Sequence, residues 1–359
     1  MKKICIISPS LKLGGIERAL TTLAIELTKK NIEVHFIICL KDAHFYTLPQ
    51  EIIVYEPVFK RNNSIINKFL FYPRLLFYLR KQIKKINPDR VLVFGDWFSP
   101  ITLLALYGSK YPVYISDRTI PDYKFKFPIP QLKKWLYPKS AGFIAQTQRA
   151  KDFKINHFGK KLKIEVIPNA LPEFERLNIN ATIKRENKLI YVGRFAWEKD
   201  PEILIKAMAI IALKFPDWIL EMAGTGPLLE PMKRLVGSLH LDKQVVFLGK
   251  VQQVEQLYQS ASILVLPSVV EGFPNTLIEG MSFGLPCVCF KEIPYEDIIT
   301  DKVDGFVVND RTPAALAEIL ENLIKEKSFR EKVGSDAALS VMRFDKREIS
   351  RKLLNFLMS

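Results

Sequence analysis

Residues that form disulfides or hold metal ions are scarce in this sequence of 359 residues. The chain has four cysteines, no Cys-x-x-Cys or Asp-x-Asp pair, and four histidines without the spacing of metal ligands. This scarcity argues against a disulfide framework, a zinc ribbon or another metal centre. We expect no metal and no other cofactor, and reduced, buried thiols at Cys5, Cys39, Cys287 and Cys289.

Long uncharged apolar runs are also absent. The best candidate, residues 91–108, is interrupted by Asp96 and Pro100, and the apolar stretch from Ile4 ends at Ser8-Pro9. A transmembrane helix needs about 20 apolar residues, and a signal peptide needs a longer apolar region than the stretch from Ile4. We therefore expect no transmembrane helix and a cytoplasmic location.

Acidic residues are missing from much of the first half of the chain. Residues 1–170 contain 29 Lys and Arg against 12 Asp and Glu, a net charge of +17, whereas the remainder carries −2. No acid occurs between Glu56 and Asp89, where eight Lys and Arg are interleaved with aromatic residues, and a second such cluster runs from Tyr123 to Lys139. The pattern favours an anionic membrane surface as a partner. No nucleic-acid-binding module accompanies this pattern, so we expect no nucleic-acid partner. The alternative to a membrane-binding surface is an amphipathic helix that packs on the core and exposes a solvated basic face.

The composition is that of a folded α/β protein. Hydrophobic residues make up 48% and charged residues 25% of the chain, and its length suffices for about two domains. Short apolar runs alternate with amphipathic segments, as in β-α-β units around parallel sheets. We expect two Rossmann-like domains, 1–170 and 171–342, facing a central cleft at the carboxyl ends of their strands. The predicted strands are 3–8, 33–40, 90–94, 113–116 and 142–145 in the first domain and 188–192, 219–223, 245–248, 263–266, 287–290 and 306–308 in the second.

Two loops that follow predicted strands are suited to a phosphate ligand. Gly14-Gly15 opens a helix after the first strand, and paired glycines there let the backbone approach an anion. The alternative is a plain strand-to-helix turn, because G-x-G-x-x-G is absent. After the strand 188–192, Arg194 and Lys199 lie on a loop that ends at Pro201. Two cations there could offset the charge of a leaving diphosphate, or they could be solvated surface charge.

The strongest signal is Glu271-Gly272-Phe273-Pro274-Asn275-Thr276-Leu277-Ile278-Glu279. Pro274 suits the first turn of a helix, so free amides at residues 275–277 would form an anion site. Glu271 lies just before this site, and Glu279 lies five residues into the helix, about 7 to 8 Å along its axis. One carboxylate could reach the hexose and the other the ribose of a nucleotide sugar. The alternative is a helix N-terminal acid and a surface acid.

Taken together, these motifs resemble the family 4 retaining glycosyltransferases of GT-B fold. Two further turns contribute to the resemblance, Ala223-Gly224-Thr225-Gly226 and Gly249-Lys250-Val251. The resemblance covers essentially the whole chain. It implies a nucleotide-diphosphate sugar donor, no metal, retention at the anomeric carbon, and a terminal segment 343–359 that folds back on the first domain.

The resemblance also implies roles for individual residues. Arg194 and Lys199 correspond to diphosphate ligands, Glu271 to the sugar-hydroxyl contact and Glu279 to the ribose contact. The other implied donor-binding residues are Gly14 and Gly15 near the phosphate, Gly224 at the cleft edge, Lys250 and Val251 beside the base, and the backbone of Gly272, Phe273, Pro274, Asn275, Thr276 and Leu277 around sugar and phosphate.

The chain departs from the family pattern at two places. Many relatives carry a histidine after the strand 113–116, where this chain reads Ser116-Asp117-Arg118-Thr119. An arginine cannot serve as a general base, so we expect Asp117, or else Asp96, to take part in catalysis with Arg194, Lys199 and Glu271. The loop 291–296 lacks the usual Pro-Gly, which would affect sugar selectivity.

The expected activity is transfer of a hexose or an N-acetylhexosamine to a lipid-linked or cell-envelope glycan, as in polysaccharide or lipopolysaccharide biosynthesis. A UDP-sugar is the favoured donor, and the expected place is the inner face of the cytoplasmic membrane. One alternative is a transferase with a soluble sugar or sugar-phosphate acceptor. The other is a non-catalytic basic protein that binds membranes or nucleic acids, although polyanion binding requires no paired acids in a cleft.

Overall fold

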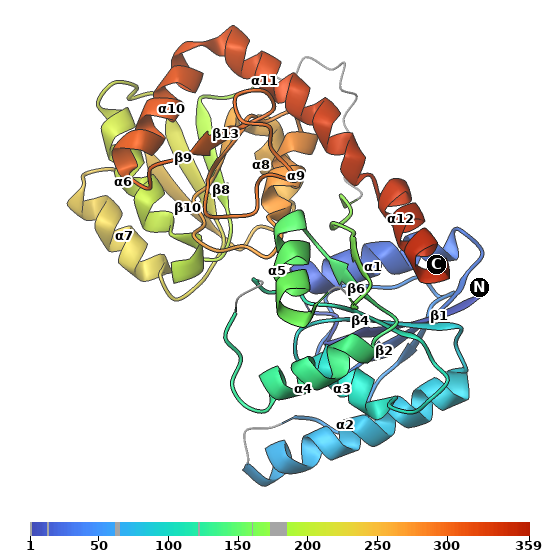
Figure 1. Ribbon diagram of the computed structural model, residues 1–359. Coiled ribbons are helices and arrows are strands. Elements are labelled where there is room, and N and C mark those ends of the chain that lie inside the picture. The colour runs from blue at the N-terminus through green and yellow to red at the C-terminus, as the bar shows by residue number, and fades with distance from the viewer. Residues whose placement is uncertain (1, 13, 62–64, 121–122, 160, 173–184) are drawn as a thin grey trace. The chain divides into compact units, whose positions relative to one another are not determined.

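The computed structural model describes residues 2–12, 14–61, 65–120, 123–159, 161–172 and 185–359, and it describes no side chains for residues 65–69. The chain divides into two compact units (Figure 1). The first comprises Met1–Pro172 with Phe344–Ser359, and the second comprises Glu173–Arg343. Each unit is a sheet of parallel strands with flanking helices, which confirms the predicted two-domain α/β class.

The first unit contains a seven-stranded sheet in the order β3-β2-β1-β4-β5-β6-β7. Its central strands are continuous apolar runs because helices cover both faces of the sheet. The short edge strands β3 and β7 were not predicted, and β2 ends two residues before its predicted end. The strands are β1 Lys3–Ser8, β2 Glu33–Ile38, β3 Ile53–Tyr55, β4 Arg90–Phe94, β5 Val113–Ser116, β6 Gly142–Ala145 and β7 Ile164–Val166.

Two groups of helices cover this sheet. Helices α1 (Gly15–Thr28) and α12 (Lys346–Met358) pack against each other and share one core with the sheet (Figure 1). A second core joins the other face to the remaining helices of the unit. These are α2 (Ile65–Ile86), α3 (Phe98–Ala105), α4 (Ile129–Leu136), the 3-10 turn η1 (Tyr137–Lys139) and α5 (Gln148–Phe158).

The second unit contains a six-stranded sheet in the order β10-β9-β8-β11-β12-β13. Its strands fall where the sequence predicts them, except that β10 extends one residue further. The strands are β8 Lys188–Val192, β9 Ile219–Ala223, β10 Val245–Gly249, β11 Ile263–Leu266, β12 Cys287–Phe290 and β13 Phe306–Val308. The helices are α6 Pro201–Ala212, α7 Leu229–Ser238, α8 Val254–Ser260, α9 Asn275–Ser282, α10 Pro313–Lys325 and α11 Lys327–Ser340, with 3-10 turns η2 Trp197–Lys199 and η3 Val341–Phe344.

Helix α12 is an integral part of the first unit although it comes last in the chain. Leu353 is fully buried in the core that α12 shares with α1. Two side chains of the sheet, Arg90 and Tyr114, donate hydrogen bonds to the carbonyl of Leu357 at 2.8 and 3.2 Å. These bonds satisfy a carbonyl at the end of the helix, where no intrahelical donor remains.

We predict that Leu353→Ala lowers the free energy of unfolding by about 2–5 kcal/mol, because it removes a buried side chain and leaves a cavity. Chemical denaturation followed by circular dichroism measures the change. The adjacent exposed residue provides the control, since Lys352→Ala should have little effect. Equal stability of the two variants would contradict the placement of α12.

Candidate functional site

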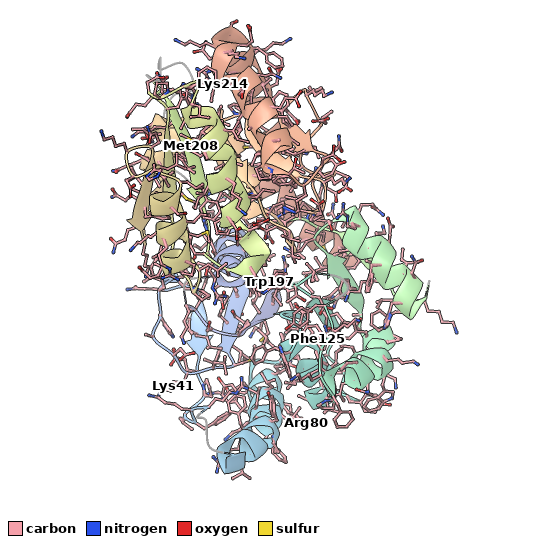
Figure 2. The ribbon with its side chains drawn as sticks, turned by 90° about the vertical axis from the view of Figure 1, so that its left-hand side faces the viewer. Lys41, Arg80, Phe125, Trp197, Met208 and Lys214 are labelled. Atoms are coloured by element: carbon pink, nitrogen blue, oxygen red, sulfur yellow. The ribbon has the colours of Figure 1, made fainter. Side chains whose placement is uncertain are left out.

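Most of the residues predicted to bind the donor lie beyond the carboxyl ends of β8, β9, β10 and β11, on the loops that follow these strands and in helix α9. Arg194 follows β8, and its side chain is 66% exposed, with Glu198 3.9 Å away. Trp197 lies on the same loop and is 69% exposed (Figure 2). An exposed guanidinium and an exposed indole are therefore available to a ligand at this edge of the sheet.

An ion pair connects the loop after β8 to the loop after β11. The ammonium group of Lys199 contacts Oε1 of Glu271, and the hydroxyl of Ser268 donates to the same oxygen at 2.8 Å. The amide of Val269 donates to the carbonyl of Glu198 at 2.9 Å. The structure thus brings Lys199 and Glu271, 72 residues apart in sequence, into direct contact.

Gly224 and Gly226 allow the loop after β9 to pack against the carbonyls of Gly193 and Phe195 in the loop after β8. Gly224 has a φ of 141°, and a Cβ there would collide with the carbonyl of Gly193. The amide of Gly224 donates to the carbonyl of Gly249 at 2.7 Å, and the amide of Phe195 donates to the carbonyl of Thr225 at 3.0 Å. Gly224, predicted as a donor-binding residue, therefore shapes the loops that would hold the donor. Lys250, which is exposed, and Val251 follow Gly249 at this same edge.

Helix α9 departs from the sequence analysis in two respects. Pro274 caps the helix, but the amides of Asn275 and Leu277 already donate to the carbonyls of Phe273 and Pro274. The expectation that these two amides are free is therefore wrong. The alternative interpretation of Glu279 as a surface acid is also wrong: its side chain is 5% exposed, and the hydroxyl of Tyr258 donates to its Oε2 at 3.0 Å.

The remaining residues of this segment differ in exposure. The side chains of Phe273, Pro274 and Leu277 are buried, so only their backbone could contact a donor. Gly272 and Thr276 are partly exposed, and the hydroxyl of Thr276 lies 3.4 Å from the carbonyl of Val192 at the end of β8.

Arg311 belongs to the same sheet edge and was missed by the sequence analysis. Its guanidinium donates twice to the carbonyl of Pro267, at 3.1 and 2.7 Å, and lies 4.4 Å from the ring centre of Phe290. It also lies 3.6 Å from Asp200 and 3.9 Å from Glu292. Arg311 therefore joins the ends of β11 and β12 to the loop after β8. Its position shortly after the strand 306–308 is the signal that could have found it.

In the first unit, the carboxylate of Glu17 lies next to the N-terminus of α1. A Cβ on Gly14 would collide with the carboxylate of Glu17, whose Oε1 accepts a hydrogen bond from Ser10 at 2.8 Å. Gly15 begins the helix and is exposed. A negative group at a helix N-terminus is favourable, so the position predicted for a phosphate already attracts an anionic side chain.

Asp117, predicted as a catalytic group, lies in a buried charged cluster. Its Oδ2 accepts hydrogen bonds from Lys154 at 2.5 Å and Lys133 at 3.0 Å, and Tyr137 donates to Oδ1 at 2.5 Å. Burial raises the pKa of Asp117, but the two ammonium groups and these hydrogen bonds lower it further, so that its pKa lies below the usual 3.8. A carboxylate with both oxygens engaged and a lowered pKa is a poor base. We therefore correct its assignment from catalytic to structural.

Asp96, the alternative, is also structural. It is 5% exposed and accepts hydrogen bonds from the amides of Arg118 and Thr119 and from Lys133, at 2.9 to 3.1 Å. These bonds hold the turn after β5 in place.

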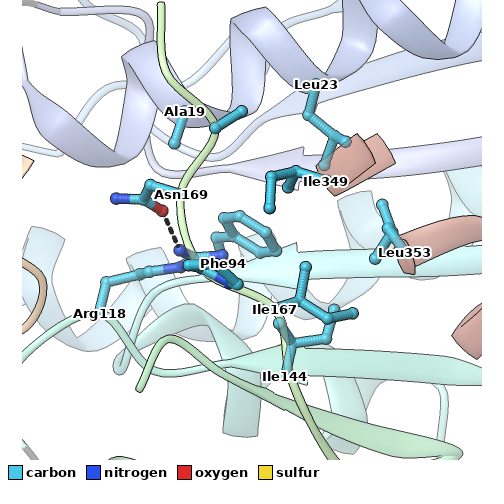
Figure 3. Close-up of a pocket in the computed structure, with 11 residues that line it drawn as sticks. Ala19, Leu23, Phe94, Arg118, Ile144, Ile167, Asn169, Ile349 and Leu353 are labelled. Carbon is cyan, nitrogen blue, oxygen red and sulfur yellow. Dashed lines mark hydrogen bonds between the residues drawn. The ribbon is translucent and has the colours of Figure 1, made fainter. Parts of the chain in front are cut away.

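Arg118 is the charged group of this turn that faces a pocket. Its guanidinium lies 3.4 Å from the ring centre of Phe94 and donates to Oδ1 of Asn169 at 2.6 Å (Figure 3). Its Nε is buried without a hydrogen-bond partner among the described residues. Burial lowers the pKa of Arg118 to about 9, so the side chain remains charged at neutral pH. The pocket is lined by Ala19, Leu23, Phe94, Arg118, Ile144, Ile167, Pro168, Asn169, Ala170, Ile349 and Leu353.

The described residues contain no group of three or more His, Cys, Asp or Glu side chains that could hold a metal ion. Within the same part of the chain, no helix is long and apolar enough to span a bilayer.

Two family models match most of the chain. The model described as "Glycosyltransferase Family 4" matches residues 13–172, and the model described as "Glycosyl transferases group 1" matches residues 174–339. The chain belongs to the family 4 glycosyltransferases, which have the two-domain α/β GT-B fold, and its activity is glycosyl transfer.

Two relatives from Campylobacter jejuni are similar along their whole length. One is 29% identical, over 99% of this chain and 98% of the relative, and is the GalNAc-alpha-(1->4)-GalNAc-alpha-(1->3)-diNAcBac-PP-undecaprenol alpha-1,4-N-acetyl-D-galactosaminyltransferase. The other is 27% identical, over 100% of both chains, and is the N-acetylgalactosamine-N,N'-diacetylbacillosaminyl-diphospho-undecaprenol 4-alpha-N-acetylgalactosaminyltransferase.

Solved structures share the fold at lower identity. The Anabaena protein HepE, crystallised with UDP and glucose, has a TM-score of 0.81 and 19% identity over 100% of both chains. The protein TarM has a TM-score of 0.84 and 13% identity over 100% of this chain and 99% of TarM. At this identity the likeness shows the fold alone.

We predict that Asp117→Asn destabilises the protein by about 3–5 kcal/mol, because it leaves Lys154 buried without its anion and removes one of the two carboxylates that pair with Lys133. Since folding lowers the pKa of Asp117, its contribution to stability is present above the unfolded value near 3.8 and is lost as the pH falls toward the folded value. Urea denaturation between pH 2.5 and 6 should therefore show a weaker acid dependence in Asp117→Asn than in the wild type.

The exposed Asp152 provides the control, because Asp152→Asn removes the same charge without uncovering buried lysines. A stable Asp117→Asn protein that has lost only turnover would restore the catalytic assignment of Asp117.

Proposed function

We propose that the protein transfers a hexose or an N-acetylhexosamine from a nucleoside-diphosphate sugar, with a UDP-sugar as the favoured donor, to a lipid-linked or cell-envelope glycan with retention at the anomeric carbon. The observation that carries the proposal is the grouping of Arg194, Lys199 and Glu271 on neighbouring loops at one edge of the second sheet, with Glu279 on helix α9, which follows the loop of Glu271. Polyanion binding alone would not require two acids among these cations.

The four side chains have distinct roles in this proposal. Arg194 and Lys199 bind the diphosphate and stabilise the negative charge that develops on it as the glycosidic bond breaks. Glu271, already oriented by Ser268 and Lys199, accepts hydrogen bonds from sugar hydroxyls. Glu279 accepts from the ribose, with Tyr258 holding its orientation.

We predict that Arg194→Ala weakens donor binding by about tenfold to a hundredfold, the usual effect of losing a hydrogen bond to a charged group. The fold should be unaffected because the side chain is largely exposed. Isothermal titration with UDP-sugars measures the affinity, and Arg234→Ala on α7, also exposed, is the matched control. Wild-type affinity in Arg194→Ala would remove this residue from the donor site.

We also propose that the reaction requires no divalent metal, because Arg194 and Lys199 place positive charge where the leaving group becomes negative. Turnover should therefore be unchanged after treatment with a strong chelator. A loss of turnover that magnesium or manganese restores would overturn this proposal.

The acceptor is proposed to be lipid-linked and to be met at the inner face of the cytoplasmic membrane. Both relatives from Campylobacter are named for undecaprenol-linked acceptors. The outer surface of the α2, α3 and α4 layer supports this proposal with cations and exposed aromatic rings. The exposed cations include Arg74, Arg80, Lys81, Lys84, Lys85, Lys110, Lys134 and Lys139, and the exposed aromatics include Phe77, Tyr107 and Trp135.

We predict that the protein sediments with anionic vesicles at low salt and is released by high salt, because each engaged cation contributes about 1 kcal/mol at an anionic surface. Neutralising Arg80, Lys81, Lys84 and Lys85 to glutamine should greatly reduce sedimentation. The control neutralises four exposed cations of the second unit, Lys206, Lys233, Arg234 and Lys243. A wild-type protein that stays in the supernatant would favour a soluble acceptor instead.

A further inference from the structure

A second pocket opens in the first unit at the amino ends of β5 and β6. It encloses about 250 Å³ and is bounded by Val113, where β5 begins, and Ala141, just before β6. Asp117 and Arg118 follow the other end of β5. The pocket therefore lies at the opposite edge of the sheet from the turn described above, and none of the proposed donor-binding residues lines it.

The pocket is lined by both apolar and polar atoms, and two aromatic rings and a lysine lie at its exposed rim. Tyr107 and Trp135 at the rim are 50% and 47% exposed, and their ring centres are 5.3 Å apart. The ammonium group of Lys139 lies 5.1 Å from the ring centre of Tyr107 and 4.6 Å from that of Trp135. The lining residues are Leu103, Leu106, Tyr107, Gly108, Ser109, Tyr111, Pro112, Val113, Leu136, Lys139, Ser140 and Ala141.

One polar group in this lining has no partner. The hydroxyl oxygen of Ser109 is buried and makes no hydrogen bond among the described residues. A buried hydroxyl without a partner costs free energy, and rotation of the Ser109 side chain toward a ligand with an acceptor oxygen would remove that cost. Ser109 and Lys139 line the same pocket, so one ligand could contact a hydroxyl and an ammonium group together.

The charge around the pocket selects for an anion. The sequence contains no acidic residue at positions 57–88, 97–116 or 123–151, which include the described parts of α2, α3 and α4. Arg80 of α2 donates to the carbonyl of Ala105 at 2.9 Å, which places its cation close to the loop that forms the rim (Figure 2). A ligand here meets positive charge without a nearby exposed carboxylate on these segments.

We infer that this pocket binds one molecule of an anionic glycerophospholipid. Its phosphate contacts Lys139 and Ser109, and an acyl chain enters between Leu103, Leu106, Val113 and Leu136. Tyr107 and Trp135 suit the boundary between the headgroup and the chain, because each ring has an apolar body and a polar tip. The inference rests on the proposed membrane attachment and adds to it a discrete, saturable lipid site.

Isothermal titration with dihexanoyl-phosphatidylglycerol below its micelle concentration tests the site on the full chain without a membrane. We expect saturable binding of one lipid per chain. Dihexanoyl-phosphatidylcholine, with the same chains and no net charge, should bind at least about fivefold more weakly, since one charge near an anion is worth about a factor of five. Glycerol-3-phosphate should also bind at least about fivefold more weakly, because it has no acyl chains to bury.

Three variants locate the site. Lys139→Gln should weaken binding of dihexanoyl-phosphatidylglycerol at least about fivefold, and Ser109→Leu should abolish it by filling the pocket while leaving every charge in place. Lys81→Gln is the matched control: it removes an exposed cation of the same layer that does not line the pocket, and it should bind as the wild type does.

The outcomes separate this inference from the proposed function. If the protein binds anionic vesicles but not the short-chain lipid, the lipid site in this pocket would be refuted, whereas the proposed membrane attachment would not. Equal affinity for the two short-chain lipids, or equal loss in Lys139→Gln and Lys81→Gln, would also overturn the inference. A Ser109→Leu protein that has the wild-type circular dichroism spectrum and unfolds at the wild-type urea concentration, but no longer binds the short-chain lipid, would support the inference independently of any folding defect.

Discussion

The ion pair between Lys199 and Glu271 is the contact on which the proposed donor site depends. It joins the loop after β8 to the loop after β11, and the bond from Val269 to the carbonyl of Glu198 reinforces it. Arg311 braces the same loops from the other side through Pro267 and Asp200. A cation and a carboxylate are thus positioned before any ligand arrives, which lowers the cost of ordering them on binding.

The need to pair buried charges also explains where charged residues lie in the first unit. A buried charge must be paired, so Asp96 and Asp117 are surrounded by Lys133, Lys154 and hydrogen-bond donors. By contrast, the segments that contain the exposed cations of the α2, α3 and α4 layer have no acidic residues to pair with them. Buried charges therefore serve the fold, whereas exposed unbalanced charges remain available to an anionic partner.

Local sequence patterns could predict the strands and site loops but not the long-range partners of their side chains. The central strands are recognisable because both of their faces are buried, whereas β3 and β7 are three-residue edge strands with little apolar pattern. Asp117 was expected to take part in catalysis because the local sequence does not reveal its partners on α4 and α5, 16 and 37 residues away. Glu279 was predicted to contact the ribose, with a surface acid as the alternative, and its burial against Tyr258 on another helix could not be predicted from the local sequence. Lys199 and Glu271 could be named from their loops, but their direct contact could not.

Incubation of the protein with a panel of nucleoside-diphosphate sugars, without acceptor, shows whether the second unit binds and activates such a donor. Release of the nucleoside diphosphate is followed by chromatography, with the Arg194→Ala protein as a parallel sample. The account predicts slow hydrolysis of a preferred donor by the wild type and clearly less by the variant. Folded wild-type protein that neither hydrolyses nor binds any donor of the panel would contradict it.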